Sequence, residues 1–245
     1  MPIEPLAGTW RMMCAPDSAG FRIPPPPGNQ SAATAAELAE LRALARNRSP
    51  QDVQQILRWS VGEPTLATHW EALANMLASR YNLSPPAAAR LNYVLNTAIE
   101  TAILAAWNMK YQYRRPRPSV LDPGVHPNVI PVPDHPAYPS GHSTAAGAAS
   151  TIIARFFPAD AGLAEALAQD SGLSRLKAGI HYRSDHTAGL ALGRQVAQRV
   201  LETIVARDGG PLAYSPRPGA RRISFPEFLA RLDRQSAVWR NSDHQ

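Results

Sequence analysis

The chain has one cysteine, Cys14, among its 245 residues, so no disulfide can form within it. Long apolar runs are also missing. Residues 98–109 and 144–157 are interrupted by Glu100 and Arg155, and both fall short of the roughly 20 apolar residues that cross a bilayer. The net charge of +6 is scattered over arginines, without a lysine-rich run or an aromatic platform. These absences argue against a disulfide scaffold, a membrane-spanning protein and a nucleic-acid-binding protein.

The first ten residues contain no basic patch followed by an apolar stretch, the pattern of a secretory signal peptide. We therefore expect the protein in the cytoplasm. Residues 1–30 include four consecutive prolines and show no periodicity, which predicts an extended N-terminal arm. Residues 31–245 are long enough to form one substantial core, so we expect a single domain there, with two smaller domains as the alternative.

Helical signals begin directly after the arm. Thr34 and Glu37 have the spacing of a capping box ahead of an apolar run, and Ser49-Pro50 reads as an N-cap followed by a first-turn proline. Ser84-Pro85 opens a long helix with a continuous apolar face. No segment alternates like a strand. The sequence therefore predicts an all-α, single-domain helical bundle.

The second half of the chain continues this pattern. Residues 116–139 hold eight prolines and no periodicity, which predicts a rigid surface crossing. A helix rich in alanine and glycine follows over 140–157, another begins near residue 160, and a third runs from 184 or 185 to about 207. Ser224 caps a final amphipathic helix. We expect His186, near a helix start, to lie on the surface.

Three short segments within residues 110–185 supply the groups that hold a tetrahedral oxyanion. The first has a lysine, six further residues and Arg-Pro; the second reads Pro-Ser-Gly-His; the third contains Ser-Arg, then a histidine and an aspartate. Forked guanidinium groups, an ammonium, a hydroxyl and an unhindered backbone N–H suit such an anion. The candidate anion-binding residues are Lys110, Arg117, Ser140, Gly141 and Arg175.

Two histidines make this anion site a candidate for chemistry, because the imidazole pKa lies near neutrality. The surrounding cations disfavour the imidazolium, so we expect His181 to be a neutral nucleophile. Asp185 follows it by four residues and can fix its tautomer. The candidate catalytic residues are therefore His181, His142 and Asp185.

In order, spacing and completeness, the three segments resemble the signature shared by type 2 phosphatidic acid phosphatases, bacterial class A acid phosphatases and vanadium-dependent haloperoxidases. The resemblance implies a helical bundle with the active site in its core. For a phosphatase it implies that His181 forms a phosphohistidine while His142 protonates the leaving group and then activates water. The anion-binding residues would stabilise the equatorial oxygens, and no cofactor would be required.

The same resemblance supports a haloperoxidase, in which vanadate is the cofactor. In that case His181 would bind vanadium, and His142 would assist peroxide activation. His181 is a metal ligand only if vanadate is bound. His135 lies seven residues before His142, where the resembling bromoperoxidases also place a histidine, so it is a candidate halide or substrate residue. Chain length favours the phosphatase, since characterised haloperoxidases are generally much larger.

The leading hypothesis is thus a metal-independent phosphatase acting on water-accessible phosphomonoesters. A vanadate-dependent haloperoxidase is the first alternative, and a non-catalytic phosphate-binding protein is the second. The expected partners are a small phosphoester, phosphate or vanadate, with neither nucleic acid nor a bilayer. The arm and the final helix are candidate contacts in a homo-oligomer, but the sequence does not fix the oligomeric state.

Overall fold

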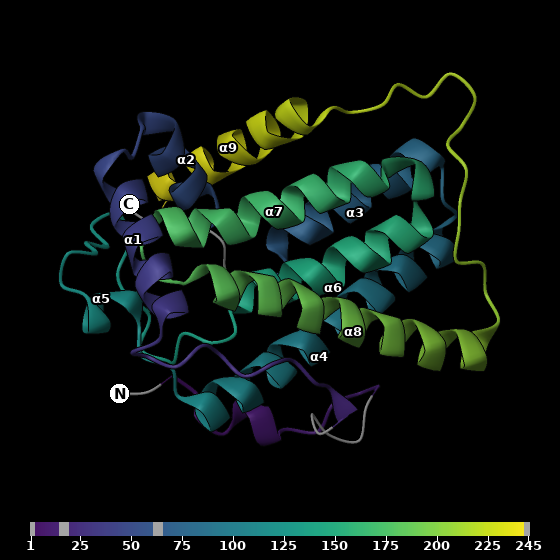
Figure 1. Cartoon of the computed structure of the whole chain (residues 1–245). Coiled ribbons are helices and arrows are strands. Elements are labelled where there is room, and N and C mark those ends of the chain that lie inside the picture. The colour runs from purple at the N-terminus through teal and green to yellow at the C-terminus, as the bar shows by residue number, and fades with distance from the viewer. Residues whose placement is uncertain (1–2, 15–19, 61–65, 243–245) are drawn as a thin grey trace.

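The computed structural model describes residues 3–14, 20–60 and 66–242, with the backbone alone at 205 and 235–242 (Figure 1). These ranges contain helices and no strand, which confirms the all-α prediction. The helices are η1 (Ala7–Thr9), α1 (Ala32–Arg46), α2 (Pro50–Arg58), α3 (Thr68–Tyr81), α4 (Pro85–Tyr113), α5 (Pro118–Leu121), α6 (Gly141–Phe156), η3 (Pro158–Asp160), α7 (Ala161–Lys177), α8 (Arg183–Asp208) and α9 (Phe225–Ser242).

Helix α6 lies at the centre of the bundle and packs against α4, α7 and α8 (Figure 1). Its small residues permit this close packing. A Cβ on Gly147 would lie 2.4 Å from the carbonyl oxygen of Leu190, and one on Gly193 would lie 2.0 Å from that of Thr144. Because a real side chain cannot occupy either position, these glycines let the backbones of α6 and α8 touch. The two helices therefore run side by side from their N-terminal ends.

Backbone hydrogen bonds join four helix ends at one end of the bundle. The amide of Ser140, which caps α6, donates to the carbonyl of Asp185 in the first turn of α8 at 3.0 Å. The amide of Ala137 donates to the carbonyl of Arg115, just beyond α4, at 2.9 Å. The amide of Ile180 donates back to Arg175 near the end of α7 at 3.2 Å. All three signature segments therefore meet there.

The start of α1 differs from the capping box expected at Thr34 and Glu37. Ser31 is the N-cap, and its hydroxyl accepts the amide of Thr34. The Thr34 hydroxyl donates to the carbonyl of Gly28, while the Glu37 carboxylate accepts the amide of Ser184 in α8. The expected box is wrong because the Thr34 hydroxyl binds a carbonyl just upstream of the helix and the Glu37 carboxylate binds a residue of another helix, so the two side chains do not cap the first turn together.

The proline-rich arm lies along the bundle in extended conformation. Phe21 and Ile23 are buried, and the backbone of Arg22 exchanges two hydrogen bonds with the side chain of Gln195 in α8. The hydroxyl of Tyr138 donates to the carbonyl of Pro24. These contacts attach the arm to α8 and to the crossing that precedes α6.

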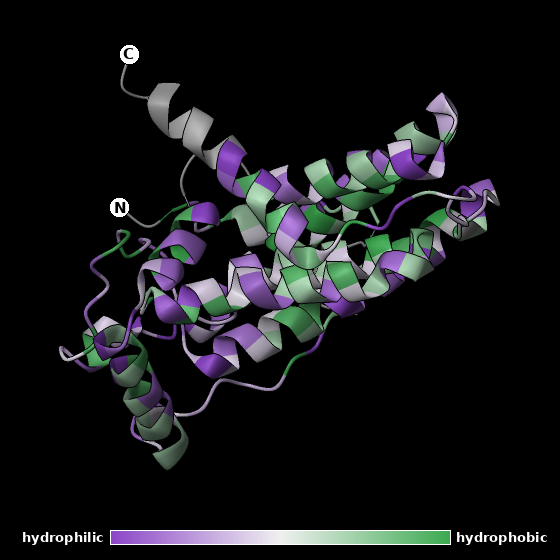
Figure 2. Cartoon of the chain, turned by 90° about the horizontal axis from the view of Figure 1, so that it is seen from above, coloured by the Kyte–Doolittle hydropathy of each residue, from purple (hydrophilic) through white to green (hydrophobic). Residues whose placement is uncertain are grey.

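Polar and apolar residues are mixed along the helices, as Figure 2 shows. Within the described residues, none of the helices has the length and apolar character that crossing a membrane would require.

Candidate active site

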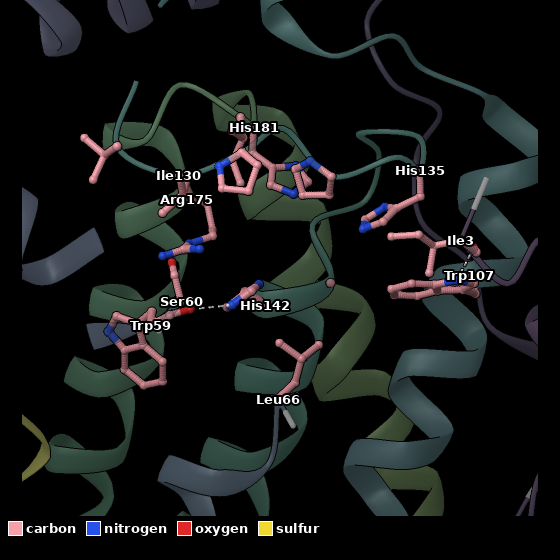
Figure 3. A pocket seen from close by; sticks show the side chains of 15 residues that line it. Ile3, Trp59, Ser60, Leu66, Trp107, Ile130, His135, His142, Arg175 and His181 are labelled. Carbon is pink, nitrogen blue, oxygen red and sulfur yellow. Dashed lines mark hydrogen bonds between the residues drawn. The ribbon is translucent and has the colours of Figure 1, made fainter. Parts of the chain in front are cut away.

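A cavity of about 540 Å³ opens at the end of the bundle where the three segments meet (Figure 3). Of the eight predicted catalytic and anion-binding residues, His142, His181, Arg175 and Gly141 line it. The other four, Lys110, Arg117, Ser140 and Asp185, are buried directly behind these residues. The structure thus brings all eight together in two layers.

The imidazole of His181 is held in one tautomer by partners on both of its nitrogens. A guanidinium can only donate, so Nε2 accepts from Arg117 Nη1 at 3.1 Å. Nδ1 therefore carries the proton and donates to Asp185 Oδ2 at 2.9 Å. Burial, and then the charge of Arg117, hold the pKa of His181 well below its usual value. The ring is a neutral base with its lone pair on Nε2.

Asp185 is completely buried, and each of its oxygens receives hydrogen bonds. Oδ2 accepts from His181 and from the amide of Tyr182, and Oδ1 accepts from Arg115 Nη1 at 2.7 Å. Burial raises the pKa of the Asp185 carboxyl, and the Arg115 guanidinium opposes that shift. The carboxylate can therefore orient His181 without moving itself.

Arg115 is a site residue that the sequence pattern does not indicate. Its guanidinium also donates to Glu37 at 2.9 Å and to the hydroxyl of Ser184 at 2.7 Å, and it lies 3.7 Å from the ring centroid of Tyr182. Its place two residues before Arg117 is the only sequence signal, and it looks like any other arginine in a basic segment. The structure shows that Arg115 links α1 to Asp185.

Arg117 and Lys110 are cations held by backbone carbonyls. Arg117 donates to the carbonyls of Ile180 at 2.6 Å and His135 at 3.0 Å, and burial lowers its pKa to about 10. Lys110 Nζ donates to the carbonyls of Pro136 at 2.8 Å and Ala137 at 3.1 Å. Burial, and then Arg117, hold the pKa of Lys110 well below its ordinary value.

The N-terminal end of α6 faces the cavity. Ser140 is its N-cap and accepts the amide of Ser143, while Gly141 lines the cavity wall. A helix N-terminus presents unpaired N–H groups and a positive dipole end, both of which favour an anion. Arg175 from the last turn of α7 enters the same cavity, with Nη2 donating to the carbonyl of Ile56 at 2.8 Å.

His142 is fixed by α2. Its Nε2 donates to the carbonyl of Trp59 at 2.9 Å, so Nδ1 carries the lone pair of the neutral ring (Figure 3). Burial, and then Arg175, hold the pKa of His142 well below its usual value. The second histidine is therefore also a neutral base when no anion is bound.

His135, the candidate halide or substrate residue, lines the same cavity. Its ring lies 4.9 Å from that of Trp107 between centroids, and its Nδ1 accepts from Arg117 Nη2 at 3.2 Å (Figure 3). Burial, and then Lys110, lower the pKa of His135 to about 3. His135 is therefore an uncharged side chain in the wall of the pocket.

The surface position expected for His186 is wrong. The residue is 3% exposed, and its ring lies between Ser143 Oγ at 2.9 Å and Gln169 Oε1 at 3.1 Å. Gly172 leaves the space, because a Cβ there would lie 2.0 Å from His186 Nδ1. His186 is a packing residue between α6, α7 and α8 rather than a member of the pocket.

Residues 89–207 match the family model described as the PAP2 superfamily, a range that contains all eight predicted residues. The vanadium-dependent bromoperoxidase of Corallina officinalis is 32% identical over 114 residues, which cover 36% of this chain and 19% of that protein. The same enzyme of Corallina pilulifera is 33% identical with the same coverage. The matches thus span about a fifth of these relatives' length, and they confirm the resemblance indicated by the three segments.

Solved structures share the fold at lower sequence identity. A bacterial vanadium-dependent iodoperoxidase has a TM-score of 0.73 at 24% identity, covering 82% of this chain and 57% of its own. A holo-type bacterial vanadium-dependent chloroperoxidase has a TM-score of 0.70 at 15% identity, covering 85% and 56%. A transmembrane PAP2-type phosphatidylglycerolphosphate phosphatase from Bacillus subtilis reaches 0.51 at 18% identity, covering 73% and 89%. These likenesses describe the arrangement of helices.

Proposed function

We propose, starting from a PAP2 superfamily segment at residues 89–207, that this protein hydrolyses phosphomonoesters through a phosphohistidine on His181. The observation that carries the proposal is the fixed proton distribution on that ring. Asp185 accepts the hydrogen bond from Nδ1–H, which keeps the proton on that nitrogen and leaves the Nε2 lone pair toward Arg117, an anion-binding cation. A neutral imidazole oriented in this way is a nucleophile for phosphorus.

The phosphoryl group binds among the cations and the N-terminus of α6. Arg175 and the amide of Gly141 lie at the cavity, and Arg117 and Lys110 lie immediately behind it. An arriving dianion competes with His181 Nε2 for the Arg117 guanidinium, so binding frees the nucleophile as it neutralises the cation. Preorganised donors of this kind stabilise the charge of the equatorial oxygens in the transition state.

The first chemical step forms a bond between His181 Nε2 and phosphorus and breaks the bond from phosphorus to the ester oxygen. His142 gives a proton from Nδ1 to the departing alkoxide, and the alcohol leaves. In the second step His142 takes a proton from water, whose oxygen attacks phosphorus. The phosphorus–nitrogen bond then breaks, and phosphate is released with His181 restored.

His142 must gain a proton before it can act as an acid. In the free pocket burial and Arg175 keep its pKa low. A bound phosphate dianion raises that pKa, because a nearby negative charge favours the imidazolium. The Trp59 carbonyl adds support, since its oxygen already accepts a hydrogen bond from Nε2–H, with 2.9 Å between nitrogen and oxygen. Substrate binding therefore favours protonation of His142, which makes it the acid that the reaction needs.

A vanadate-dependent haloperoxidase is the second candidate, favoured by the placement of His135 against Trp107 and Arg117 in the same cavity. The similarity to the two vanadium-dependent bromoperoxidases supports the same candidate. The donor set fits vanadate as it fits phosphate: Arg117, Arg175 and Lys110 would balance its charge, and His181 Nε2 would bind vanadium. When bound, vanadate would supply Lewis-acid activation of hydrogen peroxide.

A non-catalytic phosphate-binding protein is disfavoured by the pair of histidines. Binding alone would need the cations and the N-terminus of α6. Two neutral imidazoles at one anion site add no charge for binding, but they provide a nucleophile and a proton carrier.

One paired assay separates these functions. The first arm measures p-nitrophenyl phosphate hydrolysis without added metal, and the second measures bromination of a phenolic acceptor with orthovanadate, peroxide and bromide. The phosphatase proposal predicts hydrolysis that orthovanadate inhibits competitively. Robust bromination with no hydrolysis would overturn it in favour of the haloperoxidase. If neither reaction occurs but the protein still binds phosphate, the result would support the non-catalytic phosphate-binding protein.

A further inference from the structure

Much of the cavity wall around the histidines is apolar. Several parts of the chain contribute to it, including Trp107 of α4 (Figure 3), the proline-rich crossing and Ile180 before α8. From the crossing come Val129, Ile130 and Pro133. The two indole N–H groups have protein partners, since Trp59 Nε1 donates to Asp170 at 2.7 Å and Trp107 Nε1 to the carbonyl of Ile3 at 3.4 Å. The Trp107 indole therefore offers ring surface rather than a donor, whereas the Trp59 indole is 1% exposed and packs against His69 and Trp70 in the core.

Polar side chains are few on this wall. Among the described residues that line the cavity there is no carboxylate and no amide side chain. The hydroxyl of Ser60 donates to the carbonyl of Ile56 at 2.6 Å. A sugar or nucleoside would therefore bury hydroxyl groups here with few partners, which costs free energy, whereas an apolar group would lose nothing.

The apolar wall is supported from behind. Val129 and Ile130 pack against a buried cluster formed by Ile56, Ala178 and Ile180. The crossing is thus held on the bundle beside the segment that leads to His181. The cavity of about 540 Å³ is larger than a phosphate requires and lies in the usual range for small organic ligands.

We propose that the pocket selects phosphomonoesters whose organic part is apolar, with aryl groups preferred, holding the phosphoryl group at the histidines and the ring against Trp107 and Ile130. The proposal rests on the proposed function and names its substrate class. Burial of an aromatic ring against this wall should strengthen binding roughly 10- to 100-fold relative to a methyl group.

Phosphonates test this class, because their carbon–phosphorus bond is not the bond broken in the proposed reaction. Isothermal titration calorimetry would compare 1-naphthylmethyl, phenyl, methyl and 2-hydroxyethyl phosphonates on the full chain. We expect the two aryl ligands to bind at least tenfold more tightly than the other two. Equal affinities across the four would overturn the proposal.

Substitutions in the proline-rich crossing test whether its apolar side chains produce the preference for aryl ligands. Ile130→Asn and, separately, Val129→Asn should weaken the naphthyl ligand at least fivefold more than the methyl ligand. Val132→Asn is the matched control from the same crossing, because Val132 is 38% exposed and does not line the cavity. An aryl preference unchanged in both wall variants, with folding verified by circular dichroism, would contradict the proposed wall.

Hydrolysis of the matching phosphate esters distinguishes failure of this inference from failure of the proposed function. An aryl binding preference without hydrolysis would refute the phosphatase and support the ligand class. Hydrolysis at equal kcat/KM for naphthyl and 2-hydroxyethyl phosphates would support the phosphatase and refute the ligand class. Absence of binding by all four phosphonates would refute both.

Discussion

Asp185 depends on Arg115 for its charge and its position. The pair is buried, with the two side chains 0% and 1% exposed, and Arg115 Nη1 lies 2.7 Å from Asp185 Oδ1. An ionised carboxylate away from water needs such a partner. Without it, the carboxyl would rotate or take up a proton, and His181 would lose the acceptor that fixes its tautomer. Arg115 is thus a positioning residue for His181.

Replacing Arg115 with Lys should lower kcat roughly 10- to 100-fold with little change in KM, the range seen when a group supporting a catalytic ligand is lost. A lysine keeps the charge but cannot reach Asp185, Ser184 and Glu37 together. Steady-state hydrolysis of an aryl phosphate measures the effect, and 15N NMR of the His181 ring reports its tautomer. Arg114→Gln, at an exposed neighbour, is the control. Equal kcat and an unchanged tautomer in Arg115→Lys would refute the positioning role.

His186 should make the fold sensitive to acid. Burial, and then Arg183, lower its pKa to about 4, against an ordinary value near 6.5 in the unfolded chain. Between these values the unfolded state binds a proton that the folded state does not, so the free energy of unfolding falls as pH decreases. His186→Gln should therefore reduce the loss of stability between about pH 7 and pH 5 by about 2 kcal/mol.

Urea unfolding at several pH values measures this slope. His126→Gln, at an exposed site, serves as the control. Parallel pH dependence of His186→Gln and the unaltered protein would show that His186 does not contribute to acid sensitivity.

Among the elements, α2 is fixed by a buried junction with α7 and α9. Asp170 of α7 accepts from Gln55 at 2.9 Å, Arg58 at 3.1 Å and Trp59 at 2.7 Å. Arg58 also donates to Asp233 of α9 at 2.7 Å. Since the Trp59 carbonyl holds His142, the junction positions one of the two catalytic candidates from outside the cavity.

Asp170→Asn should lower the free energy of unfolding by about 3 kcal/mol, because it leaves a largely buried guanidinium with one partner fewer. The side chains of Arg58 and Asp170 are 7% and 12% exposed, so solvent screens the pair little. Glu165→Gln breaks a pair with Arg194 in which both side chains are about half exposed, and should cost less than about 1 kcal/mol. Urea titrations of the two variants compare the costs directly, and similar losses would show that the junction contributes no more than a surface pair.

Helix starts could be predicted from sequence where a capping residue acts on its own first turn. Ser49 and Ser84 are N-caps in the structure, as expected, and Ser140 caps the helix that was predicted over 140–157. The start of α1 was mispredicted because Glu37 binds Ser184 in α8, a contact that local spacing cannot reveal. His186 was misplaced for the same reason, since the space it fills is opened by Gly172 in another helix.

At the scale of the whole molecule, the bundle brings the ends of α4, α6, α7 and α8 together on one side (Figure 1), and the cavity opens there. The spacing of the three segments predicted which residues would meet. It could not predict their layering, because that depends on packing: Lys110 reaches the carbonyls of Pro136 and Ala137, while Arg175 reaches the cavity. The apolar wall likewise arises only when the crossing folds over the histidines.

The most direct test of the central claim is to stop hydrolysis of a labelled phosphoester in strong base during turnover and locate the label by mass spectrometry. The account predicts one phosphoryl group on His181 and none on His142 or His135. His181→Ala should form no labelled enzyme and lose at least 1,000-fold in kcat, as expected when a covalent nucleophile is removed. Label on another residue, or near-normal hydrolysis by His181→Ala, would contradict the proposed mechanism.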